Sequence, residues 1–93
     1  MPAVNFTVRW PDGQEFTAYS PSTVIHQHLQ HGASYPLDDF MQRAEAALDA
    51  ASERVREVKG FYCSAAMDTL SQLRHTAKSF SQGDVHVSFM QAH

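Results

Sequence analysis

The longest regular pattern in the sequence is a helical periodicity that opens within "SYPLDDF" and ends at Gly60. Its apolar positions recur at spacings of three and four residues and are Phe40, Ala44, Ala47, Leu48, Ala51, Val55 and Val58. Polar and charged residues fall on the opposite side, and Asp38 and Asp39 lie in the first turn, where the helix dipole favours negative charge. One amphipathic helix of this length needs a second layer against which to bury its apolar stripe.

The N-terminal segment supplies that layer, because "AVNFTVRW" alternates between apolar and polar residues as a half-buried strand does. The Asp-Gly pair in "PDGQ" is typical of a tight turn, and "EFTAYS" follows as a second alternating run. We therefore predict an antiparallel hairpin. Its buried face is expected to hold Val4, Phe6, Val8, Trp10, Phe16 and Ala18.

A third alternating run, "VHVSF", lies near the C-terminus and places Val85, Val87 and Phe89 on one face. We expect it to pair with the first strand, since a lone strand leaves its backbone groups without partners.

The segment "SPSTVIHQHLQHG" is typical of a short helix, with Ser20 as its cap, Pro21 at the first position and Gly32 at its end. A strand is the alternative, because "TVI" is β-branched. On a helix, the buried face is expected to hold Val24, Ile25, His28 and Leu29.

A second long helix begins near Ser64 and runs to about Phe80. Its apolar positions are Ala66, Met67, Leu70, Leu73, Ala77 and Phe80. The order of elements is therefore β-β-(short α)-α-α-β in one domain over residues 1–93. We predict an α+β fold in which the two long helices pack on one face of a small antiparallel sheet, made of the hairpin and the C-terminal strand.

Composition narrows the classes of function. A hydrophobic content of 43% in 93 residues is that of a globular chain, and a net charge of −3 argues against nucleic-acid binding. The sequence holds no apolar run long enough to span a bilayer and no glycine-rich phosphate loop, so we expect neither a membrane protein nor a cofactor. One cysteine cannot form an internal disulfide, and we expect a cytoplasmic protein.

That cysteine, Cys63, admits two interpretations. It lies at a helix start, where unpaired backbone N–H groups stabilise a thiolate, and Lys59 lies four residues back. However, Ala66 and Met67 lie three and four residues after Cys63, so Cys63 falls on the apolar stripe of the helix. A free cysteine on such a stripe is usually buried and inert. No general base is brought near it by the sequence. We interpret Cys63 as structural, with a thiol-dependent enzyme or carrier as the alternative.

The "HQHLQH" cluster raises the hypothesis of a metal site at His26, His28 and His31, because imidazole is a common metal ligand. On a helix, His26 and His28 point in nearly opposite directions, and only His28 and His31 can meet. No HExxH or CxxC spacing accompanies them. We interpret these histidines as exposed polar residues around one that is partly buried, with a metal-binding protein as the alternative.

Two groups of residues are candidates for binding. Trp10 and Tyr19 lie at the hairpin, and aromatic residues often anchor interfaces, although they can equally complete the core. Arg54, Arg56 and Lys59 form a basic patch at the end of the long helix. Cations there complement the helix C-terminus, and they can also hold an anion or the carboxylates of a partner.

The motifs "FTVRWPDG", "YSPS", "GASYPLDDF", "ALDAASERVR" and "GFYCSAAMDTL" together resemble the nitrogen starvation response proteins, a family of small bacterial proteins. The resemblance covers Phe6 to about Leu73. Genes of this family lie in clusters with a nitrilase, a radical SAM protein, an acetyltransferase-like protein and a flavin-dependent oxidoreductase, associated with nitrogen scavenging and cyanide assimilation. The resemblance supplies no catalytic residue. Together with the small size of the domain and the lack of an assembled catalytic set, it leads us to predict an accessory protein that binds an enzyme of that cluster. If the chain instead senses a small nitrogen compound, we expect a homodimer, because so small a domain more readily forms a pocket at a dimer interface.

Overall fold

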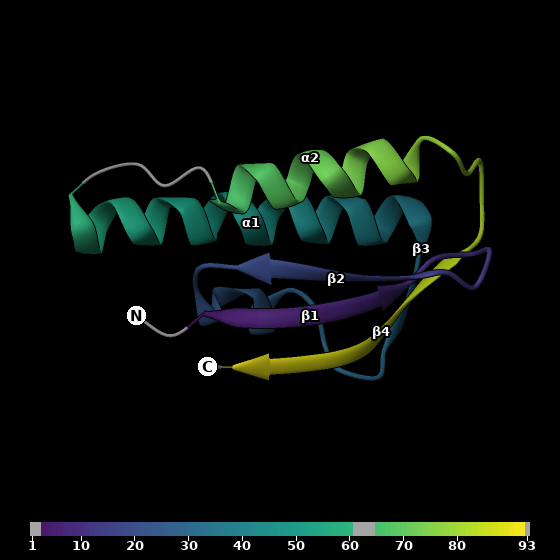
Figure 1. Cartoon of the computed structure of the whole chain (residues 1–93), viewed down its shortest axis with the longest axis horizontal. Helices are drawn as coiled ribbons and strands as arrows, with labels where there is room; N and C mark the ends of the chain where they lie inside the picture. The colour runs from purple at the N-terminus through teal and green to yellow at the C-terminus, as the bar shows by residue number, and fades with distance from the viewer. Residues whose placement is uncertain (1–2, 61–64, 93) are drawn as a thin grey trace.

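Seven elements follow one another in the computed structural model, which describes residues 3–60 and 65–92 (Figure 1). The strands are β1 (Val4–Arg9), β2 (Glu15–Ser20), β3 (Ser34–Pro36) and β4 (Asp84–Ala92). The helices are the 3-10 helix η1 (Thr23–Gln27) and the α-helices α1 (Leu37–Lys59) and α2 (Ala65–Ala77). An antiparallel sheet with helices packed on it confirms the predicted α+β class.

The hairpin is confirmed, and β1 pairs antiparallel with β2 along its whole length. Two backbone hydrogen bonds of 2.8 Å close the turn. The N–H of Trp10 donates to the carbonyl of Gln14, and the N–H of Gly13 donates to the carbonyl of Trp10. The carboxylate of Asp12 accepts a third bond, from the N–H of Gln14 at 3.0 Å, as aspartate commonly does in turns.

The sheet has the strand order β2-β1-β4-β3. The C-terminal strand pairs antiparallel with β1, as predicted. The sequence did not predict β3, whose three residues lie in the segment assigned to the start of the long helix. This strand pairs antiparallel with Asp84–His86 of β4. Three residues are too few to show an alternating pattern, so β3 becomes visible only through its partner strand.

The segment after β2 is helical, as expected, but it begins later than predicted. Its cap is Ser22 rather than Ser20, because the Oγ of Ser22 accepts a hydrogen bond from the N–H of Val24 at 3.3 Å. The hydroxyl of Ser20 instead donates to the carbonyl of Ser22 at 2.9 Å. Ser20 therefore stabilises the turn that precedes η1 and does not cap the helix.

The same helix also ends earlier than predicted, at His28 instead of Gly32. The N–H of Gly32 donates to the carbonyl of Val87 at 2.7 Å, so the chain has by then left the helix and reached β4. Ile25 and Leu29 are buried, as expected, whereas Val24 and His28 are only partly buried.

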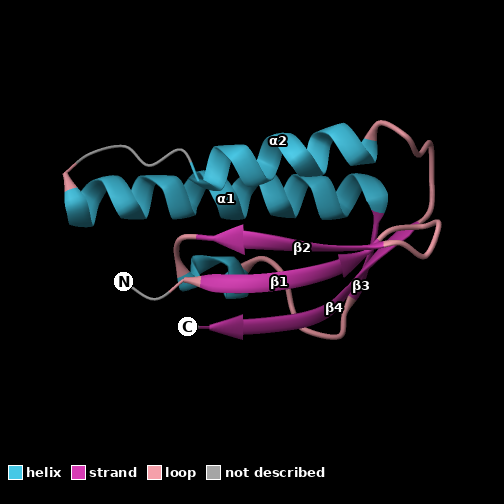
Figure 2. Ribbon diagram, viewed as in Figure 1, coloured by secondary structure: helices cyan, strands magenta, loops and turns pink. Residues whose placement is uncertain are grey.

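Helices α1 and α2 lie side by side over one face of the sheet (Figure 2). The predicted end of α1 is confirmed, because Gly60 has a left-handed φ of 76° and its N–H donates to the carbonyl of Arg56 at 2.9 Å. The apolar stripe of α1 is buried from Phe40 to Val55. Val58 was expected on this stripe but is 57% exposed. The reason is visible in Figure 1, where the last turns of α1 extend past the described parts of α2 and the sheet.

Strand β4 contains a second departure from the predicted pattern. Phe89 was expected on the buried face but is 45% exposed, and Met90 is buried instead. The pairing with β1 shifts between Thr7 and Val8, so that β4 holds one extra residue, Ser88. Such a β-bulge reverses the face on which the following side chains lie.

Candidate functional site

The two arginines of the predicted basic patch, Arg54 and Arg56, lie in the last turns of α1. Their side chains are 63% and 64% exposed, and each has a glutamate of its own helix 3.9 Å away. Exposed pairs at that distance contribute little to stability. Val58 adds an exposed apolar side chain close by in the sequence. Arg54 and Val58 are four residues apart and share one side of the helix, whereas Arg56 points to the nearly opposite side. We call these three residues, which surround the end of α1, the helix-end surface.

Arg43, by contrast, forms close contacts with residues of two other segments as well as with its own helix. Its Nε donates to Asp39 Oδ2 at 2.9 Å, and this hydrogen bond raises the pKa of the Arg43 guanidinium. The guanidinium also lies over the ring of Tyr35, 4.7 Å from its centre, and donates to the carbonyl of His28 at 3.2 Å. These contacts join α1 to the segment that leads into β3. Arg54 and Arg56 differ from Arg43, because their ion pairs with other described residues are the two long ones within α1.

Arg54 also borders a hollow of about 280 Å³ between η1 and α1. The other residues that line it are Ser22, Thr23, Val24 and Gln27. Hydroxyl and amide groups of η1 thus face the same space as the Arg54 guanidinium. The sequence could not predict this neighbour, because it depends on how η1 packs against α1.

Trp10 and Tyr19 lie on opposite faces of the sheet. Trp10 is only 3% exposed, and its ring packs edge-on against Phe40 and stacks on Phe80. Its side chain therefore completes the core and offers almost no surface to a partner. Tyr19 is exposed on the face turned away from the helices, as Phe89 is. We call this surface the open face.

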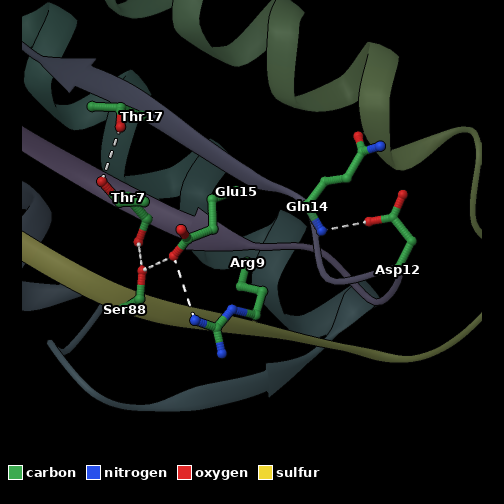
Figure 3. Close-up of polar contacts among 7 residues, drawn as sticks. All are labelled: Thr7, Arg9, Asp12, Gln14, Glu15, Thr17 and Ser88. Carbon is green, nitrogen blue, oxygen red and sulfur yellow. Dashed lines mark hydrogen bonds and ion pairs between the residues drawn. The ribbon is translucent and has the colours of Figure 1, made fainter.

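The open face carries a connected polar network across β2, β1 and β4 (Figure 3). The Oγ1 atoms of Thr7 and Thr17 lie 3.0 Å apart. The hydroxyl of Ser88 lies 3.3 Å from the carbonyl of Thr7 and 3.2 Å from Glu15 Oε2. Glu15 Oε2 is also 3.5 Å from Arg9 Nη2. These polar groups form hydrogen bonds and an ion pair with one another, so a role in holding neighbouring strands together explains their presence.

The three histidines of the predicted cluster do not share one helix, because His26 lies in η1, His28 is its C-cap and His31 follows it. His26 and His31 are exposed, whereas His28 is partly buried. The ring of His31 packs edge-on against Phe89, with 5.9 Å between the ring centres. Within residues 3–60 and 65–92, no group of three or more His, Cys, Asp or Glu side chains is arranged to hold a metal ion.

Cys63 lies outside the described residues, and so does the side chain of Lys59. The interpretation of Cys63 as structural, and of Lys59 as part of the basic patch, therefore stay predictions.

A second hollow, of about 330 Å³, lies between the first half of α1 and the end of α2. Its lining residues are Leu37, Asp38, Met41 and Glu45 from α1, with Arg74, Ala77, Lys78, Phe80 and Ser81 from α2 and the residues after it. We call it the α1–α2 groove. The sequence does not reveal this groove, because periodicity assigns each residue to a face of its own helix and does not show which residues of two helices meet.

The fold and its surfaces can be compared with known families. A family model described as nitrogen starvation-induced protein NitG matches residues 5–92. The chain belongs to this family. No curated protein and no solved structure matches it.

The NitG match extends the predicted resemblance, which ended near Leu73, to include β4. It therefore takes in the helix-end surface, the open face and the α1–α2 groove. Among the described residues, neither α-helix of this NitG family member combines the length and the apolar character needed to cross a membrane.

Proposed function

We propose that this protein serves the response to nitrogen starvation as an accessory protein that binds a partner enzyme, and that the helix-end surface makes the contact. The observation that carries the proposal is the exposure of Arg54 and Arg56 near the end of α1, whose last turns extend past the described parts of α2 and the sheet (Figure 1). Their ion pairs within α1 are long, so a partner can replace them at little cost.

The chemistry of this surface suits a protein partner. Arginine is enriched among the residues that dominate binding energy, and its planar guanidinium holds carboxylates through two parallel hydrogen bonds. Val58 adds an apolar contact that the fold leaves exposed. Because Arg54 and Arg56 lie on nearly opposite sides of α1, we expect a partner that encloses the helix end, with carboxylates on both sides and an apolar contact for Val58. An enzyme of the nitrogen-scavenging cluster, in the cytoplasm, is the partner that the family resemblance implies.

The test is a pull-down of the tagged protein from nitrogen-starved cells, followed by reconstitution of the complex with the purified enzyme. We expect one cluster enzyme in near-stoichiometric amount. Arg54→Glu and Arg56→Glu are each expected to reduce its affinity at least tenfold, because each replaces an attraction with a repulsion. Arg9→Glu is the matched control, since it makes the same charge change on the open face.

Full retention of binding by both helix-end variants would contradict the assignment of this surface. A tagged Tyr19→Ser variant, tested in the same way, shows whether the open face contributes instead. Failure to recover any cluster enzyme with the unaltered protein would contradict the accessory function itself.

A further inference from the structure

Some of the charged residues around the α1–α2 groove are paired and others are not. Glu45 of α1 and Arg74 of α2 form an ion pair across the groove, with 2.9 Å between Oε1 and Nη2. Asp38 of α1 and Lys78, which follows α2, also line the groove. Neither of them forms an ion pair with any residue in the described part of the chain. The groove thus presents one carboxylate and one ammonium group that do not neutralise each other directly.

The surface between these charges is apolar. Leu37, Met41, Ala77 and Phe80 line the groove beside them. Phe80 is partly exposed on this side and stacks on the buried Trp10, with 6.0 Å between the ring centres and 12° between the planes. The apolar surface of the groove is therefore continuous with the core, and its shape is supported by Trp10.

We propose that the α1–α2 groove binds a free α-amino acid with an apolar side chain. The carboxylate of Asp38 accepts hydrogen bonds from the ammonium group of the ligand, and the ammonium group of Lys78 donates to the carboxylate of the ligand. The side chain of the ligand lies on Met41, Ala77 and Phe80. A zwitterion matches the lining of the groove in kind, because it presents both charges and an apolar group in one molecule.

The dimensions agree with this class of ligand. A volume of about 330 Å³ is at the lower end of the range of small-molecule sites. Asp38 and Lys78 are both exposed, so water and salt weaken each charged contact. Binding is therefore strongest when all three contacts form together, and removing any one of them is expected to lower the affinity measurably.

Trp10 supplies the measurement, because it is the only tryptophan in the sequence and stacks directly on a residue of the groove. The probe is L-leucine, titrated into the full chain while Trp10 emission and the heat of binding are recorded. Three analogues each lack one feature: leucinamide lacks the carboxylate, 4-methylpentanoate lacks the ammonium group, and glycine lacks the apolar side chain. We expect saturable binding of leucine and affinities about tenfold lower for each analogue, which is the loss of one charged or apolar contact.

Variants assign the two charges. Lys78→Met is expected to weaken leucine about tenfold but to leave the weaker binding of leucinamide unchanged, because that ligand has no carboxylate to lose. Asp38→Asn is expected to weaken leucine and to leave 4-methylpentanoate unchanged. Asp49→Asn is the matched control, since Asp49 is exposed on α1 outside the groove. The three residues are exposed, so far-UV circular dichroism is expected to show an unchanged fold.

The proposal is overturned if leucine gives neither a change in Trp10 emission nor heat of binding. It is equally overturned if leucine, leucinamide and 4-methylpentanoate bind alike, because the charges then play no part. Neither outcome bears on the helix-end surface, whose test uses different residues and a protein partner.

Discussion

Trp10 directly follows β1 and fills the space between the sheet and the helices. Its ring centre lies 5.9 Å from that of Phe40, which belongs to α1, and 6.0 Å from that of Phe80, which follows α2. One side chain thus joins the end of β1 to α1 and to the segment that follows α2. Among the described residues, its indole N–H has no hydrogen-bond partner, and an unpaired buried donor lowers stability. The indole ring therefore stabilises the fold through its packing and not through its polar atom.

We expect Trp10→Ala to lower the free energy of unfolding by about 3–5 kcal/mol, since it removes a large buried ring. Trp10→Phe is expected to cost clearly less, because a phenyl ring keeps much of the packing and removes the unpaired N–H. Urea unfolding followed by far-UV circular dichroism measures both. Tyr19→Ala, at an exposed aromatic residue, serves as the control and is expected to change stability by about 0.5 kcal/mol or less. An equal loss for the alanine and phenylalanine variants would contradict the expectation that a phenyl ring keeps much of the packing.

At the level of secondary-structure elements, β4 departs most from the alternating pattern of the sequence. Simple alternation places Phe89 on the buried face with Val85 and Val87. The bulge at Ser88 instead exposes Phe89 and buries Met90. The hydroxyl of Ser88 lies within hydrogen-bond distance of Thr7 and Glu15 on the open face, so the extra residue is held in place by neighbouring strands.

The bulge can be tested by replacing each of two neighbouring residues of β4 with alanine. We expect Met90→Ala to lower the free energy of unfolding by about 2–5 kcal/mol, because it removes a buried side chain. Phe89→Ala is expected to change it by about 0.5 kcal/mol or less, since Phe89 is on the surface. Simple alternation predicts the opposite order. Chemical denaturation of the two variants decides between them, and a larger loss for Phe89→Ala would contradict the observed register.

Across the whole molecule, the features that the sequence could predict are those that repeat over many residues. The hairpin and α1 follow from long patterns of period two and period 3.6, together with turn and end signals at Gly13 and Gly60. The bulge depends on a single residue, and β3 has only three, so neither produces a pattern of its own. The exposure of Arg54 and Arg56 follows from their place on a helix, whereas the α1–α2 groove arises only when residues distant in the sequence are packed together.

The two proposed surfaces lie towards opposite ends of α1. Asp38 borders the α1–α2 groove and Arg56 belongs to the helix-end surface, and a helical rise of 1.5 Å per residue places them roughly 27 Å apart. Contacts so far apart act independently unless the protein changes conformation between them. The two proposals together therefore predict that one molecule holds an amino acid and a partner protein at the same time.

We expect saturating L-leucine to leave the affinity for the partner enzyme unchanged within about twofold, because the ligand touches none of the residues of the helix-end surface. The measurement is a titration of the purified partner with and without leucine, using Lys78→Met as the variant in which leucine is weakly bound. A change in affinity that appears in the unaltered protein and disappears in Lys78→Met would show that α1 couples the two sites. Simple competition, in which leucine displaces the partner completely, would instead place the partner in the α1–α2 groove and contradict the separation of the two surfaces.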